Sequence, residues 1–176
     1  HKAYRFSLYP QKSQEQIIAQ YFGCVRKVYN MAHDKRQNLY QEEKKSLSKF
    51  DLIKELTVLK KTEEYSYLSD VYSQCLQCSI EHLDLAYKNV FRRIKQGVKG
   101  RKIGIPKFKS KHDSRQSCFF PQNVKVLFEE GLIHFPKLGL IKAKLHRRFK
   151  EGAVVKTVTL VRESTGKYFA SVLGPV

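Results

Sequence analysis

The order of apolar and polar residues divides the chain into a first strand, a helical block and a strand-rich block. Apolar and polar side chains alternate over residues 2–8, which is the pattern of a half-buried strand. From residue 11 to residue 97 the apolar residues recur every three or four positions, as in amphipathic helices. After residue 100 the period changes to two within segments 124–135, 140–146 and 155–173, which turn residues separate.

Three helical stretches are predicted in the helical block. In the first stretch, Ser13 and Gln16 have the spacing of a capping box, and Gly23 is a candidate break between two helices. The second stretch covers residues 50–59. The third has the clearest apolar stripe, with Ser69 as the expected N-cap. The residues of this stripe, all expected on one face, are Leu76, Ile80, Leu83, Tyr87, Val90, Phe91 and Ile94.

In the strand-rich block, the alternation of apolar and polar residues predicts two hairpins and a strand between them. Residues 124–135 form one hairpin that turns at residues 129–131, and residues 155–173 form another that turns near residues 164–166. Between the two hairpins, apolar and polar residues alternate over residues 140–146, which predicts a further strand. The opening strand is too short to stand alone, so it must pair with these later strands. The predicted fold class is therefore α+β, a β-barrel interrupted by a helical domain.

Positive charge dominates the second half of the chain. The 176 residues carry 34 Lys and Arg against 16 Asp and Glu, a formal net charge of +18. Ten basic residues and no acidic one lie between Lys88 and Lys111. A surplus of this size opposes compaction unless an anionic partner binds. Nucleic acid is favoured over a membrane surface, because no amphipathic helix opposes these charges with an apolar face. The alternative is a solvated, mobile basic loop.

The residues predict no active site. The histidines lack metal-binding spacing, and the only CxxC pair, Cys75 and Cys78, lies within a helical stripe without a second pair. The acidic residues of the strand-rich block fall in expected turns, where carboxylates are usually solvated. No apolar run reaches the length of a membrane span, and the four cysteines have no disulfide-scaffold spacing. We therefore expect a cytoplasmic protein, bound at the nucleoid when it binds DNA.

Polar and basic side chains supply candidate binding residues instead. Gln and Asn side chains can read adenine edges, Lys and Arg bind phosphates, and aromatic rings stack on bases. The alternative is that the same polar residues cover a solvent face and the rings belong to the core. The candidate readers of a DNA motif are Ser73, Gln74, Gln77, Gln122 and Asn123. The candidate stacking residues are Phe108, Phe119 and Phe120. The candidate backbone contacts are Lys88, Arg92, Arg93, Lys95, Lys99, Arg101, Lys102, Lys107, Lys109, Lys111, Arg115, Lys144, Arg147 and Arg148.

Five sequence blocks together resemble TnpB, the OrfB-type accessory transposase of an insertion-sequence family. They are YRFSLYPQKSQEQIIAQYFGCVRKVYN (4–30), VYSQCLQCSIEHLDLAYKNVFRR (71–93), GIPKFKSKHDSRQS (104–117), GLIHFPKLGLIKAKLHR (131–147) and VKTVTLVRESTGKYFASVL (155–173). The resemblance implies a wedge β-barrel (residues 1–10 and 98–176) interrupted by a helical recognition domain (residues 11–97) with a helix-turn-helix-like start.

The resemblance also implies a function. TnpB proteins are RNA-guided DNA endonucleases that bind a guide RNA from the transposon end and read a short motif in duplex target DNA. By the family's VxSQxLQ pattern, the motif readers fall on Ser73, Gln74 and Gln77. Their RuvC-like nuclease and zinc finger follow the barrel, and this chain ends before the first catalytic aspartate. No cofactor is therefore expected in this chain, and Mg²⁺ is expected for the missing nuclease domain.

Three alternatives stay open at this level. The chain can be a regulator that binds DNA through residues 13–44 and represses transcription, although that segment mixes basic and acidic residues. It can belong to an enzyme whose nuclease half lies outside these residues. It can also serve a structural role in a ribonucleoprotein without target DNA. The oligomeric state does not follow from the sequence.

Overall fold

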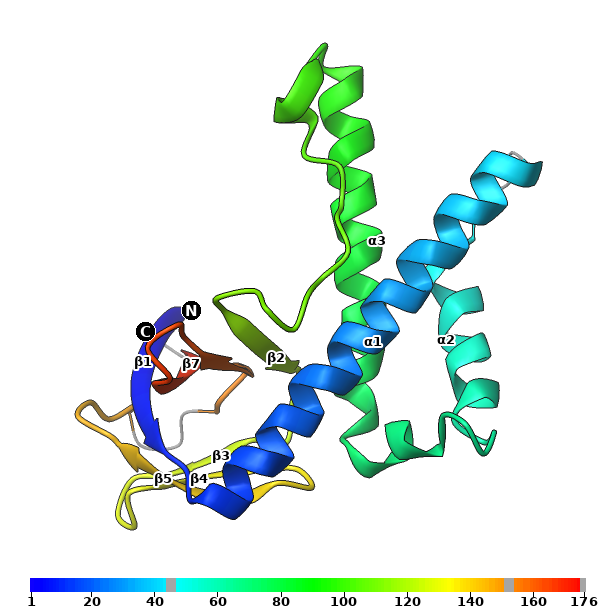
Figure 1. The fold of residues 1–176 in the computed structure, drawn as a ribbon. Coiled ribbons are helices and arrows are strands. Elements are labelled where there is room, and N and C mark those ends of the chain that lie inside the picture. Colours follow the sequence, from blue (N-terminus) through cyan, green and yellow to red (C-terminus); the bar gives the residue numbers. More distant parts are fainter. Residues whose placement is uncertain (44–46, 151–153, 175–176) are drawn as a thin grey trace.

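The fold is α+β, with a helical arm beside one curved sheet (Figure 1). The computed structural model describes residues 1–43, 47–150 and 154–174. Strand β1 (Lys2–Tyr9) leads directly into helices α1 (Lys12–Glu43), α2 (Lys49–Leu59) and α3 (Ser73–Lys95). Two short 3-10 helices, η1 (Ser66–Asp70) and η2 (Gly100–Ile103), flank α3. The remaining strands follow, so the helices are inserted between β1 and the rest of the sheet.

Seven antiparallel strands form the sheet in the order β2-β6-β7-β1-β5-β4-β3. The strands after the helices are β2 (Gln116–Phe120), β3 (Lys125–Leu127), β4 (Leu132–Phe135), β5 (Gly139–Lys144), β6 (Thr157–Arg162) and β7 (Tyr168–Gly174).

Strand β1 lies in the interior of this sheet. Its residue Phe6 opposes Ala170 of β7, and its residue Leu8 opposes Ala143 of β5. The prediction that the opening strand pairs with later strands is therefore confirmed, as are both hairpins and their turns. Among the described residues β2 and β3 are the edges of an open sheet, so closure into a wedge barrel stays a prediction. The domain boundaries at residues 10 and 97 also stay predictions.

The first helix differs from its prediction. Residues 12–43 form one continuous helix, and Gly23 lies inside it without a break. The capping-box prediction is also wrong, because Ser13 and Gln16 lie within the helix. Instead the Gln14 side chain accepts a hydrogen bond of 2.9 Å from the backbone N–H of Gln11. A glycine in a helix interior costs about 1 kcal/mol, which the packing of the neighbouring apolar residues offsets.

The other two helices begin at different caps. At α2 the Ser48 hydroxyl accepts a hydrogen bond of 3.1 Å from the Asp51 backbone N–H, a regular N-cap. At α3 the residue before the helix is Tyr72, so the prediction of Ser69 as its N-cap is wrong. Ser69 instead lies in η1.

One aromatic cluster joins the helices to the sheet. The ring of Phe120 in β2 lies 5.4 Å from that of Tyr21 in α1 and 5.2 Å from that of Phe135 in β4. The Tyr21 hydroxyl donates to the Pro136 carbonyl at 2.6 Å and accepts from the Tyr72 backbone N–H at 3.0 Å. Burial raises the pKa of Tyr21, which keeps this hydroxyl protonated. The position of α1 on the sheet and the start of α3 are thereby fixed together.

The apolar stripe of α3 is buried over only part of its length. Leu76, Ile80, Leu83 and Val90 are buried, as predicted. Phe91 and Ile94 are 62% and 51% exposed, so their assignment to the core face is wrong. The reason lies in the arrangement of the helices, because the last turns of α3 project beyond the sheet and diverge from α1 (Figure 1).

Candidate nucleic-acid interface

A basic segment, residues 104–113, lies across α1 and is anchored to it at Lys109. The Asn30 side chain donates from Nδ2 to the Lys109 carbonyl at 2.9 Å and accepts at Oδ1 from the Lys109 N–H at 2.8 Å. The Lys109 ammonium lies 4.2 Å from the centre of the Tyr29 ring. Burial lowers the pKa of Lys109. Two hydrogen bonds and a cation–π contact thus hold this residue, which is exposed like its neighbours Lys107 and Lys111.

Arg93 fixes the start of the basic segment. Its Nη1 donates a hydrogen bond of 2.9 Å to the Ile103 carbonyl, which closes the basic turn of residues 96–103 back onto α3. Gly104 follows with a φ of +69°, and a Cβ there would lie 2.8 Å from Arg93 Nη1. Only glycine fits this backbone without strain. Arg93, predicted as a phosphate contact, therefore has a structural hydrogen bond within the protein.

Gln116 fixes the end of the basic segment. This buried side chain donates from Nε2 to the carbonyls of Ser110 and Asp113, at 3.0 Å and 3.1 Å. Its Oε1 accepts a hydrogen bond of 3.1 Å from Arg26 of α1. The segment is therefore an ordered part of the molecule, in contrast to the mobile basic loop that the sequence left open.

His33 and Tyr87 support the middle of the segment from α1 and α3. The Tyr87 hydroxyl is 2.7 Å from His33 Nδ1. The ring of Phe108 makes an edge contact with that of His33, with 4.6 Å between centres. Burial of His33 lowers its pKa, since the charged imidazolium would lose its hydration. The neutral histidine then accepts or donates within this network without adding charge to an already cationic surface.

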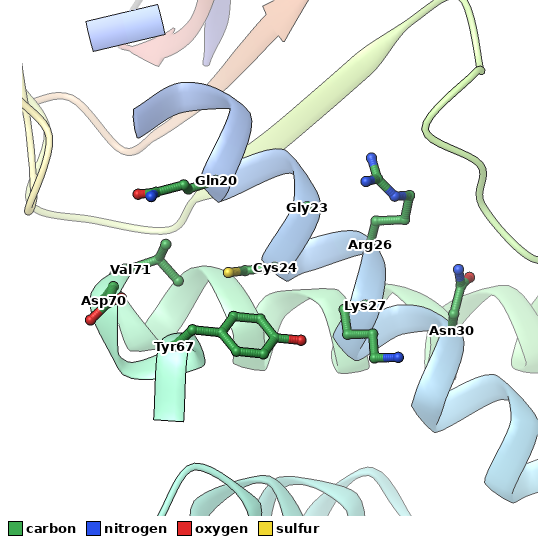
Figure 2. A pocket seen from close by; sticks show the side chains of 9 residues that line it. All are labelled: Gln20, Gly23, Cys24, Arg26, Lys27, Asn30, Tyr67, Asp70 and Val71. Atoms are coloured by element: carbon green, nitrogen blue, oxygen red, sulfur yellow. The ribbon is translucent and has the colours of Figure 1, made fainter. Parts of the chain in front are cut away.

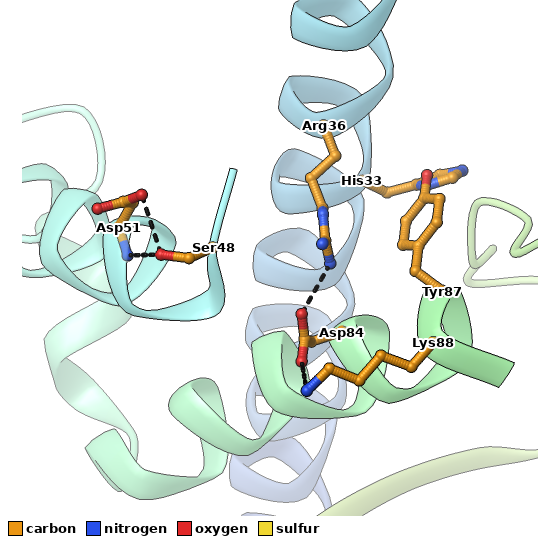
Figure 3. A network of polar contacts seen from close by, with 7 residues as sticks. All are labelled: His33, Arg36, Ser48, Asp51, Asp84, Tyr87 and Lys88. Carbon is orange, nitrogen blue, oxygen red and sulfur yellow. Dashed lines mark hydrogen bonds and ion pairs between the residues drawn. The ribbon is translucent and has the colours of Figure 1, made fainter. Parts of the chain in front are cut away.

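A second polar network lies beside His33 (Figure 3). Asp84 of α3 contacts Arg36 Nη1 at 3.3 Å and Lys88 Nζ at 3.2 Å. The Arg36 guanidinium also lies 4.7 Å from the centre of the Tyr87 ring. Lys88, a predicted phosphate contact, thus shares a carboxylate with Arg36, although two thirds of its side chain stays exposed. This network fixes α1 against α3 where the two helices begin to diverge.

The structure brings four of the predicted motif readers toward one place, the start of α3 and the turn after β2. Gln122 Nε2 donates to Gln74 Oε1 at 2.8 Å, and Asn123 Nδ2 donates to the Tyr72 hydroxyl at 2.8 Å. Asn123 has a φ of +66°, a left-handed conformation that asparagine tolerates and that turns its side chain toward α3. Ser73 lies beside Gln74 in the first turn of the helix. We call Tyr72, Gln74, Gln122 and Asn123 the amide cluster.

Gln77 lies one turn further along α3 and is half-buried. Within residues 1–43, 47–150 and 154–174, the Nε2 of Gln74 and the Oε1 of Gln122 have no other hydrogen-bond partner. The cluster therefore presents one amide donor and one amide acceptor next to each other. No aliphatic side chain can supply such a pair.

All the remaining predicted cations are exposed. Arg148 forms an ion pair with Glu129 across the sheet edge, and Lys144 opposes Ser7 at the end of β5. The exposed residues of this set are Arg92, Lys95, Lys99, Arg101, Lys102, Lys107, Lys111, Arg115, Lys144, Arg147 and Arg148.

The stacking prediction needs one correction. Phe108 is 53% exposed and Phe119 is half-buried, so both rings have free surface. Phe120 is 0% exposed and is enclosed by the aromatic cluster of Tyr21, Tyr72 and Phe135. It is therefore a core residue and cannot stack on a base. Alternation along β2 explains why the two neighbouring phenylalanines differ.

A hollow of about 360 Å³ lies beside α1 and η1 (Figure 2). Cys24 and Val71 form its apolar part, and the phenol of Tyr67 extends along it. Lys27 and Asp70 give it opposite charges at different points. This mixture favours no single ligand, so the hollow is not assigned to the interface.

The four cysteines are all buried as free thiols. Burial raises the pKa of Cys24 to about 11 and that of Cys78 to about 12, which disfavours the thiolate that binds metal. The described residues contain no group of three or more His, Cys, Asp or Glu side chains that could hold a metal ion. They therefore do not fit the divalent ion that nuclease chemistry would use. Among the same residues, no helix is long and apolar enough to cross a membrane.

Sequence reasoning missed the residues that shape the interface. Asn30, Arg26 and Gln116 hold the basic segment, yet none was predicted as a site residue. Arg26 and Asn30 belong to the block of residues 4–30 and Gln116 to the block of residues 104–117, both used for the family resemblance. Their position in those blocks was the signal that could have marked them as site residues. The spacing along the chain, however, does not show that the two blocks contact each other.

Comparison with known proteins agrees with the resemblance. Residues 1–45 match the family model HTH_OrfB_IS605, described as a helix-turn-helix domain. In this chain those residues contain β1 and the single continuous helix α1.

Two curated relatives match nearly the whole chain. A Streptomyces pristinaespiralis protein named "Putative RNA-guided DNA endonuclease" is 31% identical over 173 residues, which are 98% of this chain and 41% of the relative. The Escherichia coli (strain K12) protein "Putative RNA-guided DNA endonuclease InsQ" is 32% identical over 171 residues, 97% of this chain and 40% of the relative. The chain thus spans about two fifths of the length of these relatives. Together with the helix-turn-helix match, they show that nearly the whole chain is similar to part of a TnpB-type (OrfB) insertion-sequence protein.

Proposed function

We propose that this chain is the nucleic-acid-binding part of a TnpB-like RNA-guided DNA endonuclease. It binds a guide RNA through its basic surface and reads a short DNA motif beside the target through the amide cluster. Guide pairing reads the target sequence, so the protein needs few base-reading groups and many phosphate contacts. Cleavage, with Mg²⁺, belongs to residues outside this chain. Such a complex works in the cytoplasm, on nucleoid DNA.

The anchored basic segment is the observation that carries the RNA part of the proposal. Ten cations lie between Lys88 and Lys111 with no acidic residue among them in the sequence, and contacts from Asn30, Arg93 and Gln116 hold the part of this run that continues into the basic segment. Ordering this segment costs conformational entropy, and its charges repel each other. A cationic surface that is already ordered binds a folded polyanion more tightly, because binding then carries no free-energy cost for ordering the protein. A-form RNA is recognised in this way, by shape and backbone.

The amide cluster supports the DNA part. The free donor of Gln74 and the free acceptor of Gln122 match the N7 acceptor and N6 donor that adenine presents in the major groove. A helix start is narrow enough to enter that groove, and Gln77 lies on the next turn. We therefore propose an A·T pair within the motif.

Sequencing of bound RNA tests the proposal. The 176-residue chain is expressed in cells that carry the transposable element, purified under mild salt and compared with an unrelated protein of equal size and net charge. Transcripts from the element's end are expected to be enriched only on this chain. Equal enrichment on the cationic control contradicts guide RNA binding. Tighter binding to duplex DNA than to RNA in the same buffer favours the regulator instead.

A further inference from the structure

Four aromatic rings form a continuous row across three segments of the interface. Phe108 of the basic segment contacts His33 of α1, with 4.6 Å between ring centres. His33 contacts Tyr87 of α3 at 5.7 Å, and Tyr87 is stacked near Phe91 at 6.4 Å. Figure 3 shows His33 and Tyr87 meeting between the two helices. We call these four residues the aromatic row.

The two ends of the aromatic row are open and its middle is supported. Phe91 is 62% exposed and Phe108 is 53% exposed, whereas His33 is buried and Tyr87 is bonded to it. Exposed phenylalanines at both ends of a fixed row are costly in water, because each leaves a large apolar face hydrated. His33 and Tyr87 therefore position the two outer rings.

Cations border the row, and the Asp84 carboxylate beside it is paired with Arg36 and Lys88. Lys88, Arg92 and Lys95 follow Tyr87, Phe91 and Ile94 by one residue each, so they form a parallel stripe on the neighbouring face of α3. No Asp or Glu occurs between residues 85 and 112. Rings beside phosphate-binding cations are the combination that holds unpaired nucleotides.

We propose that Phe91 and Phe108 stack on unpaired bases of the bound RNA while the stripe of Lys88, Arg92 and Lys95 contacts its phosphates. This inference rests on the proposed function and adds a binding mode to it. A protein partner fits less well, since interface cores are depleted of lysine. A duplex fits less well too, because its bases are already stacked. Phe91 also lies about 25 Å along α3 from Gln74, so RNA loops and the DNA motif contact opposite ends of one helix.

Phe91 variants test the aromatic contact. The 176-residue chain is titrated against fluorescein-labelled oligouridylate and against a fully paired RNA duplex, and binding is followed by anisotropy. Phe91→Ala and Phe91→Leu are expected to weaken oligouridylate binding about tenfold, and Phe91→Trp to restore it. Duplex affinity and the salt dependence of binding are expected to stay unchanged, because the cations are intact. Phe50→Ala is the control, since Phe50 is 65% exposed on α2 beside Lys49.

Several outcomes overturn the inference. Wild-type affinity in Phe91→Leu shows that the ring does not stack, and equal losses on duplex and single strand show a general defect. If oligothymidylate binds as tightly as oligouridylate and the Phe91 variants weaken both equally, the surface binds any single-stranded nucleic acid and not RNA in particular. Concentration-dependent self-association that Phe91→Ala abolishes assigns it to a second copy of the chain. If the wild-type chain binds no RNA better than the cationic control protein, the proposed function itself fails.

Discussion

The side-chain amide of Asn30 forms two hydrogen bonds with the backbone of Lys109, one to its carbonyl and one from its N–H. A side chain that satisfies both backbone groups of one residue fixes that residue as a strand partner would. The contact joins α1 to the basic segment across 79 positions of the chain.

Removing this contact is expected to loosen the basic segment. Asn30→Ala leaves a backbone donor and acceptor without protein partners, and we expect a loss of about 1–2 kcal/mol in the free energy of unfolding. Trypsin is expected to cleave faster after Lys107 and Lys111. Limited proteolysis followed by mass spectrometry and urea unfolding measure both effects. Asn38→Ala is the control, because Asn38 lies on the same helix and, within the described part of the chain, its side chain bonds to Asp34 and not to the basic segment.

Charge reversal on the basic segment is expected to reduce the salt dependence of RNA binding. Lys107→Glu with Lys111→Glu removes two exposed cations, so the slope of log K against log salt should fall by about 1.5 to 2. Lys109 is left intact, because its ammonium packs on Tyr29 and its loss would disturb the fold. Filter binding over a salt series measures the slope. An unchanged slope, or an equal change in the Lys54→Glu and Lys61→Glu control on α2 and just beyond it, argues against this surface.

The motif-reading residues are expected to act on DNA alone. Gln77→Ala should relax the preferred flanking motif and leave RNA affinity within about twofold, since base contacts specify while phosphate contacts supply most affinity. Gln122→Ala should have a similar effect, because it also frees Gln74. Selection from a randomised flank library with the RNA-loaded complex gives the preference. An identical motif from wild type and Gln77→Ala contradicts the assignment, and Gln96→Ala at the other end of α3 is the control.

Stability is expected to rise with pH between about pH 5 and pH 7. The pKa of His33 is lowered in the folded protein, so near pH 6 the unfolded chain binds a proton that the folded chain does not. The slope is at most about 1.4 kcal/mol per pH unit for each such histidine. His82 shifts in the same direction for the same reason. Thermal unfolding of wild type and His33→Gln from pH 5 to pH 8 measures it, and a variant as steep as wild type contradicts the prediction.

The periodicity of the sequence predicted local elements better than it predicted helix exposure. Both hairpins and all three helical regions were found, because alternation and helical spacing reflect burial on one face. Strand β2 was not predicted, since the run of basic residues before it has no alternation. The exposure of Phe91 was missed because periodicity tells which face an apolar residue shares and not whether another element covers that face. Gly23 was overrated as a break, since tertiary packing outweighs a propensity of about 1 kcal/mol.

The site was less predictable than the fold. Residue types identified phosphate and base contacts, but the contact between Gln122 and Gln74 joins segments 48 positions apart. Several of the predicted phosphate contacts also have internal partners: Arg93 bonds to a carbonyl, Lys88 pairs with Asp84 and Arg148 pairs with Glu129. The i,i+4 spacing of Asp84 and Lys88 on a helix is a sequence signal for their ion pair. No charge pattern shows that Arg93 lies near the Ile103 carbonyl.

The interior position of β1 has a consequence for biogenesis. Its neighbours β5 and β7 are translated more than 130 residues after it, so the earliest-made strand waits on the ribosome for its partners while the helices after it can already assemble. Such distant pairing slows folding and leaves an apolar ribbon uncovered in the interval. The first strand accordingly stays without its sheet partners until the last hairpin emerges from the exit tunnel.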